Sequence, residues 1–288
     1  MYDNRLISKN TAIKQLVYGY LLTALDAYDQ CREKLHLQNR KIPLHRARDS
    51  ERVLYISGLA LQLAKSHNQD ALEIGRAIVN HLSDTCGETL NVQIVPPGWI
   101  HLEVSHFFLA TWLQNLVVKK IYISTPLENE KSREKLHNPS RLFAIQYAHA
   151  RCYSLILLAH REGLIQLHTP SDQYQLGSLA TTASIPWLNS DAKLRLNHPA
   201  ESRLIAELVK TVDELEFPDH GDRINWEKVG LDLSQAFEDF WCQCRIWGAV
   251  KTALPELTQA RLGLLMITQS VLRFLLVNKL GAIAPWEL

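Results

Sequence analysis

A polar segment of mixed charge, residues 119–139, divides the chain and limits its possible folds more than any other feature. It contains acidic and basic side chains in similar numbers and two prolines, Pro126 and Pro139, whereas both flanks are rich in regularly spaced apolar residues. Interdomain linkers have such compositions because few contacts cross them. The sequence therefore predicts two domains, 1–118 and 140–288, joined by a linker over 119–139.

The first of these regions mixes helical and strand-like patterns. Apolar residues recur at spacings of three and four over 11–35 and again over about 70–83, which predicts helices. Residues 92–95 and 99–104 alternate as strands do, and the turn sequence Pro96-Pro97-Gly98 separates them. Ser105 is suited to cap a following helix over 106–117. These patterns predict an α+β domain containing a β-hairpin.

The second region has helical spacing almost throughout. The spacing and the glycine and proline positions predict four main helices, over 142–161, 201–215, 231–253 and 255–280. The aromatic residues of the third helix recur at helical intervals and are predicted to lie in the core: Phe237, Phe240, Trp241 and Trp247. The expected fold class is mainly α, with an N-terminal α+β domain followed by an all-α helical bundle.

The overall composition is that of a folded protein without a strong electric field. Hydrophobic residues make up 47% and charged residues 21%, and the formal net charge is +1. Any basic surface must therefore be local. No secretory pattern opens the sequence and the apolar runs are short, so we expect a soluble, cytoplasmic protein with neither a membrane nor DNA as partner. The five cysteines lack a regular spacing and are expected to be reduced thiols.

The strongest local concentration of positive charge falls between Arg32 and Arg52. Arg46 and Arg48 lie within it, and they are candidates for neutralising phosphate groups. Pro43 makes a long helix through this run unlikely to form. The alternative is a solvated loop with no ligand, which is the usual state of a charge run.

Two separate motifs carry a resemblance to a known family. Asn138-Pro139 is followed by the sequence Tyr147-Ala-His149-Ala-Arg151, and the chain closes with Leu280-Gly281-Ala-Ile-Ala-Pro285-Trp-Glu-Leu288. Both resemble the anticodon-binding domain of arginyl-tRNA synthetases, the first as its opening signature and the second as its last residues. The resemblance covers 138–288 and implies a helical anticodon-binding domain there.

The resemblance also implies roles for individual residues. In the family the closing methionine approaches the anticodon, which implies a base contact for Leu288, although Trp286 and Leu288 depart from the family's residues. Tyr147 would stack on or hydrogen-bond to an anticodon base and Arg151 would meet phosphate, with His149 on the same helix as a third candidate. The alternative is that the three residues hold the helical bundle together through internal hydrogen bonds.

The hairpin is similar to part of the family's additional N-terminal domain, which leans on the elbow of tRNA. The sequence Ile94-Val95-Pro96-Pro97-Gly98-Trp99-Ile100-His101 occupies the family's extended segment, turn and aromatic position. In the family, the residues matching Trp99 and His101 contact a base of the D-loop, but the family has asparagine where this chain has His101. The alternative is that Trp99 covers the core of the hairpin.

The family's catalytic part is missing between these two regions. A large nucleotide-binding domain separates them in a synthetase, whereas here only 119–139 does. These residues contain no histidine-x-glycine-histidine motif, no lysine-rich ATP loop and no glycine-rich phosphate cradle. The histidines show no spacing with carboxylates that suits a metal. We therefore expect no catalytic residues, no cofactor and no metal site.

Three functional hypotheses follow from these observations. The first is a non-catalytic arginyl-tRNA synthetase-like protein that binds structured RNA, with tRNA as the first candidate. The second is a regulatory or scaffold module that keeps the fold and binds a protein partner instead. The third is an accessory subunit that acts in trans with a synthetase.

Overall fold

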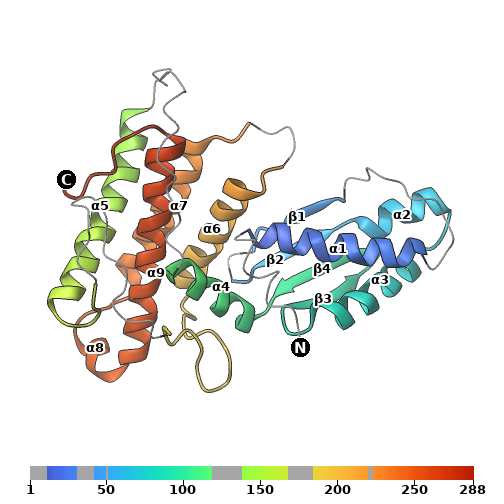
Figure 1. The fold of residues 1–288 in the computed structure, drawn as a ribbon, viewed down its shortest axis with the longest axis horizontal. Helices are drawn as coiled ribbons and strands as arrows, with labels where there is room; N and C mark the ends of the chain where they lie inside the picture. The colour runs from blue at the N-terminus through green and yellow to red at the C-terminus, as the bar shows by residue number, and fades with distance from the viewer. Residues whose placement is uncertain (1–11, 31–41, 50, 119–137, 168–183, 220–222) are drawn as a thin grey trace. The chain divides into compact units, whose positions relative to one another are not determined.

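The computed structural model describes residues 12–30, 42–49, 51–118, 138–167, 184–219 and 223–288. They form two compact units, which are treated separately below (Figure 1). The N-terminal unit comprises Met1–Leu109 with Val212–Asp219, and the helical unit comprises Ala110–Thr211 with His220–Leu288. The proposed linker lies almost entirely outside the described ranges, so its boundaries stay a prediction.

The N-terminal unit is built on a four-stranded antiparallel sheet with the strand order β1-β2-β4-β3. Its helices are α1 (Ile13–Gln30), α2 (Leu59–His67) and α3 (Ala71–Cys86). Its strands are β1 (Leu44–Arg46), β2 (Leu54–Ser57), β3 (Leu90–Val95) and β4 (Trp99–Val104). The predicted hairpin is confirmed as β3 and β4, in a register that pairs Val95 with Trp99. The sequence analysis did not foresee β1 and β2.

One face of this sheet is buried and the other is more open. Ile100 and Leu102 alternate with Trp99 and His101 along β4, and the first pair is fully buried. Helices α2 and α3 pack on the sheet. Gly75 of α3 allows this approach, because a Cβ there would lie 2.1 Å from Cδ1 of Ile94. The sheet therefore places Trp99 and His101 on its open face.

A segment from much later in the chain completes the N-terminal unit. Val212–Asp219 contributes Asp213, whose carboxylate accepts hydrogen bonds from the Tyr55 hydroxyl and, at 2.9 Å, from the backbone N–H of Lys14. Lys14 also forms a 2.8 Å ion pair with Asp219. Asp213 is 5% exposed. It therefore joins β2, the first turn of α1 and its own segment at one buried point.

The helical unit contains most of the remaining elements. They are α4 (His106–Val118, in this unit from Ala110), α5 (Pro139–Arg161), α6 (Pro199–Glu216, in this unit up to Thr211), α7 (Trp226–Gln243), α8 (Ala249–Ala253), α9 (Pro255–Phe274) and a π-helical turn, η1 (Leu275–Lys279). Helix α9 is the most buried of them and packs on α5 and α7. This arrangement confirms the expected fold class, a mainly helical chain with a small sheet near its N-terminus.

The start of α5 explains the Asn138-Pro139 motif in physical terms. The Asn138 side chain accepts hydrogen bonds from the backbone N–H groups of Ser140 and Arg141, at 3.1 and 3.3 Å. Pro139 occupies the first turn, where its missing N–H costs nothing. The pair is therefore a strong signal for the start of a helix, whatever the helix binds.

The third predicted helix, over 231–253, is wrong in one respect. The chain leaves helical geometry at Cys244 and resumes it after Gly248, so two helices, α7 and α8, replace the expected one. Gly248 has a φ of +82°, which residues with a side chain rarely adopt. The aromatic residues keep helical spacing across the break, so the sequence pattern did not indicate where α7 ends.

Two helices of the described structure, α5 and the stretch Pro255–Lys279, are long and apolar enough to cross a membrane by length and composition alone. In α9 and η1, 72% of the most apolar window is buried inside the fold, as in the core helix of a soluble protein. The corresponding share for α5 is 44%. Because core helices pass the same test, this is weak support for a membrane span.

Candidate nucleic-acid interface

The exposed side of α5 carries two aromatic rings close together. Phe143 and Tyr147 are four residues apart, so they lie on one face of the helix. Their side chains are 57% and 43% exposed, and their rings are near-parallel, 6.4 Å between centroids with an interplanar angle of 24°. Large apolar rings are usually buried away from water in folded proteins. An exposed pair of this kind can stack on a flat ligand such as a nucleic-acid base.

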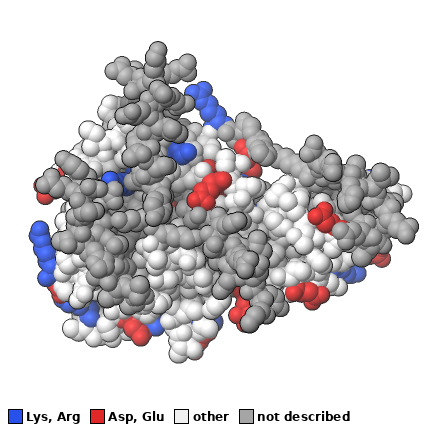
Figure 2. All heavy atoms as spheres, in the orientation of Figure 1, with Lys and Arg blue, Asp and Glu red and all other residues white. Residues whose placement is uncertain are grey.

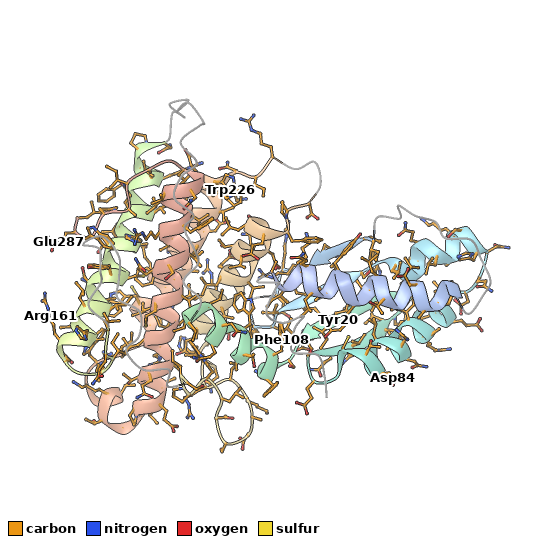
Figure 3. The ribbon with its side chains drawn as sticks, in the orientation of Figure 1. Tyr20, Asp84, Phe108, Arg161, Trp226 and Glu287 are labelled. Carbon is orange, nitrogen blue, oxygen red and sulfur yellow. The ribbon has the colours of Figure 1, made fainter. Side chains whose placement is uncertain are left out.

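Helix α5 is also basic. Arg141, Arg151 and Arg161 are exposed and the helix contains no Asp or Glu. Figure 2 shows Lys and Arg on the visible face as separate groups, interspersed with Asp and Glu rather than merged into one field. Figure 3 labels Arg161 at the outer edge of the helical unit, where α5 ends. The positive charge of this helix is therefore local, as the net charge of +1 requires.

Arg151 has an aromatic neighbour that the sequence analysis placed in the core. Its guanidinium carbon lies 5.1 Å from the centroid of the Trp241 ring, a cation–π distance. Trp247 packs edge-on against Trp241 with 6.0 Å between centroids. Both tryptophans are partly exposed, whereas Phe237 and Phe240 are buried as predicted. The prediction of a core position is therefore wrong for Trp241 and Trp247.

The break between α7 and α8 makes this aromatic pair possible. Residues six apart on a continuous helix differ by about 120° around the axis and about 9 Å along it, so their rings do not meet. The irregular stretch after Cys244 brings Trp247 to Trp241. Its indole N–H donates to the Glu162 carboxylate at 3.1 Å, and the Lys251 ammonium donates to the same oxygen at 2.9 Å. Glu162 therefore connects the end of α5 to Trp247 and to Lys251 of α8.

His149, in contrast, lies inside the helical unit. It has no exposed surface, and its Nδ1 is 2.9 Å from the Pro285 carbonyl oxygen while its Nε2 is 2.9 Å from the Gln269 amide nitrogen. A carbonyl can only accept, so Nδ1 carries the proton and Nε2 accepts from the amide. Burial lowers the pKa of His149 to about 4. A ring in this position does not reach RNA directly; it holds the bundle and the last residues together.

Leu288, the other candidate of this unit, is 63% exposed. It follows Trp286, which packs on Tyr153 with 4.5 Å between ring centroids. The structure thus leaves Leu288 available for contact while its neighbour is anchored. Its predicted base contact stays a prediction.

In the N-terminal unit, Trp99 packs against Gly58 and His45. A Cβ at Gly58 would come within 3.2 Å of the indole, and the His45 ring meets the indole edge-on at 6.2 Å. The side chain remains 37% exposed. His101 is half-buried and pairs across the sheet with Ile56 and Gln93. His45 is a neighbour of this pair that the sequence analysis did not single out.

The two candidate arginines of the basic run behave differently. Arg48 is exposed, whereas Arg46 is partly buried and lies near Asp213, where its charge opposes the effect of burial on the pKa of that carboxyl. Arg46 therefore has an internal role in addition to any contact with phosphate. The other basic residues of the run, apart from Arg52, fall outside the described ranges.

Within the described ranges, no group of three His, Cys, Asp or Glu side chains is arranged to hold a metal. Three of the described cysteines, Cys86, Cys152 and Cys244, are buried, and burial raises the pKa of each thiol. The fourth, Cys242, is exposed. None of these arrangements suggests a reactive centre.

Comparison with known proteins gives one informative match. The arginine–tRNA ligase of Gloeobacter violaceus is 31% identical over 142 residues, which is 48% of this chain and 21% of that protein. The chain therefore matches about a fifth of the length of its curated relative. No protein-family model matches the chain, and no solved structure does. These findings indicate a distant relation to an arginine–tRNA ligase over part of the chain.

Proposed function

We propose that this chain is a non-catalytic, arginyl-tRNA synthetase-like protein that binds structured RNA, with tRNA as the first candidate. The observation that carries the proposal is the exposed face of α5, where the Phe143 and Tyr147 rings are near-parallel and Arg151 lies four residues after Tyr147. Single-stranded RNA loops are recognised by rings that stack on bases and by cations that meet phosphate. The relation to an arginine–tRNA ligase supports the same ligand class.

The charge pattern of α5 favours RNA over a neutral ligand. A helix with three exposed arginines and no carboxylate attracts a polyanion, and the attraction is independent of sequence. The Arg151 guanidinium lies over the Trp241 ring, and we propose that this contact orients it towards phosphate. Phosphate contacts of this kind position an RNA, while the rings contact its bases.

The open face of the sheet is the second contact surface in this proposal. Trp99 is backed by Gly58 and bordered by His45, so it offers one flat, fixed surface beside His101. A platform held in this way loses little conformational freedom when a base stacks on it. Arg48 is the exposed cation closest in sequence to β1 and is the phosphate-binding candidate in this unit.

Catalysis is not part of the proposal. Amino-acid activation needs groups that bind ATP and stabilise charge on its phosphates, and these 288 residues contain no motif for it. We expect no exchange of pyrophosphate into ATP in the presence of arginine and tRNA. Exchange above the level of a buffer blank would overturn the non-catalytic assignment. We further propose a cytoplasmic location, where tRNA is available.

The test is a filter-binding titration with total tRNA at several salt concentrations, using matched variants of α5. Tyr147→Ala removes a ring of the proposed platform, and Leu158→Ala removes a side chain of similar exposure, 40%, from the same helix. We expect Tyr147→Ala to weaken binding by about 1–3 kcal/mol, as for one stacked base. Leu158→Ala should leave binding unchanged. Equal effects, or no saturable binding at low salt, would refute the proposal.

One observation favours a protein partner as the second candidate. Exposed apolar side chains on α5 and near the end of the chain, including Phe143 and Ile283, could form the centre of a protein interface. A pull-down from the host in which RNA and protein are both identified separates the candidates. A protein that stays bound after nuclease treatment, with no tRNA recovered, would favour a scaffold. Recovery of a synthetase would favour an accessory subunit.

A further inference from the structure

The last residues of the chain, Ala282–Leu288, form a strap along α5. Three contacts follow one another in order. The Gln146 amide donates to the Ile283 carbonyl at 2.8 Å, His149 Nδ1 donates to the Pro285 carbonyl at 2.9 Å, and the Tyr153 ring meets Trp286 at 4.5 Å. Figure 3 labels Glu287, near the end of the strap, on the same side of the helical unit as Arg161. The strap therefore follows α5 in the direction of that helix.

The positions of these contacts determine which strap residue lies beside the aromatic pair. Residues 146, 149 and 153 are spaced by three and four, so they form one stripe of α5. Phe143 and Tyr147 belong to the adjacent stripe and bracket the level of Gln146 along the helix axis. Since Gln146 bonds the carbonyl of Ile283, the backbone of Ile283 lies at the level of the pair along the helix axis. Ile283 is 79% exposed.

Trp286 is the side chain that holds the strap in this register. Its ring has Tyr153 on one side, lies 6.0 Å from the His149 ring and has the Arg273 guanidinium carbon 5.3 Å from its centroid. These partners come from α5 and α9, so one ring joins the strap to both helices. Ile283 and Leu288, which lie on either side of Trp286 in the strap, are 79% and 63% exposed.

We propose that Trp286 is a positioning residue, which fixes the strap so that Ile283 completes an apolar strip with Phe143 and Tyr147 and contacts an unpaired base of the RNA. This inference rests on the proposed function and adds to it a binding residue, Ile283, and the residue that orders it. An ordered strap has already lost its conformational freedom, so binding does not need to order it again.

The experiment measures two properties of the same variants. Backbone NMR order parameters of the strap amides report whether the strap is held, and filter binding with total tRNA reports affinity. Trp286→Ala should lower these order parameters from about 0.85, the value of rigid backbone, to below about 0.6, the value of a flexible segment. It should also weaken binding by about tenfold, within the range found for loss of one stacking contact. Trp286→Phe, which keeps a ring, should restore most of both.

Ile283→Ala separates contact from positioning. It should leave the order parameters of the strap amides unchanged and weaken binding by about threefold or more, since only the contacting side chain is lost. Leu254→Ala, which shortens an exposed side chain elsewhere in the helical unit, is the control and should change neither property. Because Ile283 is exposed, this variant stays informative even where Trp286→Ala destabilises the fold.

The outcomes distinguish the inference from the function on which it rests. Absence of RNA binding by the unchanged protein overturns both. Normal RNA binding by the unchanged protein, together with unchanged affinity in Trp286→Ala and Ile283→Ala, overturns the inference and leaves the proposed function standing. Unchanged order parameters of the strap amides in Trp286→Ala would remove the positioning role of Trp286, whatever the affinity.

Discussion

In each unit, a buried ionisable side chain attaches a segment from a distant part of the sequence. The side chain is an acid, Asp213, in the N-terminal unit and a base, His149, in the helical unit. In the N-terminal unit, Asp213 brings Val212–Asp219 to Tyr55 and to the first turn of α1. In the helical unit, His149 ties the strap to α5 and, through Gln269, to α9. Burial favours the neutral form of either group, which is the acid for Asp213 and the free base for His149.

This difference makes the two units respond to pH in opposite directions. Burial raises the pKa of Asp213 to about 6 and lowers the pKa of His149 to about 4. Where the folded state binds more protons than the unfolded chain, stability falls as pH rises; where it binds fewer, stability falls as pH drops. The attachment in the N-terminal unit should therefore be strongest in mild acid, and the one in the helical unit strongest near neutrality.

The largest expected effect concerns His149. The unfolded chain takes up its proton near the ordinary pKa of 6.5, whereas the folded state does so only near pH 4, so stability of the helical unit is lost between these values on acidification. The loss should approach about 3 kcal/mol at about 1.4 kcal/mol per pKa unit. His149→Gln, which does not titrate, should remove this part of the pH dependence. Urea unfolding followed by circular dichroism at pH 4–7 measures it. A parallel decline in both proteins would contradict this assignment.

Asp213 provides the opposite test, of similar or slightly smaller size. Its pKa is raised from 3.8 to about 6, so it stabilises the N-terminal unit fully below pH 4 and this contribution disappears as pH rises through 6. The charged groups that face it are Arg46 and Lys14, and the neutral Tyr55 hydroxyl donates a hydrogen bond to it. Asp213→Asn should flatten the stability of this unit over pH 4–7, by up to about 3 kcal/mol.

Hydrogen exchange of β2 and β4 amides, corrected for intrinsic rates, follows the N-terminal unit separately from the helical unit. Protection of these strands in the unchanged protein should increase on acidification towards pH 4. If protection decreases instead, or if Asp213→Asn keeps the same profile, burial does not control the protonation of Asp213. The opposite pH dependence of the two units would then not hold for the N-terminal unit.

The two candidate binding surfaces should also differ in how much their aromatic residues stabilise the fold. Trp99 is packed on Gly58 and His45, whereas Tyr147 is packed mainly on Phe143 at the surface. Trp99→Ala should lower the free energy of unfolding by about 1–2 kcal/mol and Tyr147→Ala by less than about 0.5 kcal/mol. Thermal unfolding of both variants provides the comparison. A larger loss for Tyr147→Ala would indicate that its ring is mainly structural.

The smallest expected effect is the cation–π contact of the helical unit. A double-mutant cycle with Arg151→Ala and Trp241→Ala should give a coupling energy of about 0.5–1 kcal/mol for an exposed pair. The measurement is urea unfolding of the two single variants and the double variant. Additive losses would show that Arg151 and Trp241 are neighbours without energetic coupling, which would weaken the argument that Trp241 orients Arg151.

Much of the fold was predictable because local rules determine it. Asn138-Pro139 starts a helix through capping and a preset φ, and the alternation across Pro96-Pro97-Gly98 produces a hairpin. The short strands β1 and β2 were not predictable, because three or four residues are too few to show an alternating pattern. Pairing with β4 stabilises β2 as a strand, and that pairing is a long-range property.

The candidate site divides in the same way. Spacing alone placed Tyr147 and Arg151 on one face of a helix, and the structure has both exposed. Spacing could not show that His149, two residues from each, is fully buried, since that depends on Gln269 and Pro285 far along the chain. It also could not show that Trp241 and Trp247 meet, because the break between α7 and α8 brings the two rings together.

The sequence by itself determined the helices, the hairpin and the residues that give the chain its resemblance to arginyl-tRNA synthetases, because these depend on neighbours within a few positions. Only the tertiary structure decided which of those residues face solvent, that Asp213 completes the N-terminal unit, and that Trp286 of the strap packs on Tyr153. Burial, pKa and contact all depend on groups brought together from distant parts of the chain, and no local pattern records that proximity.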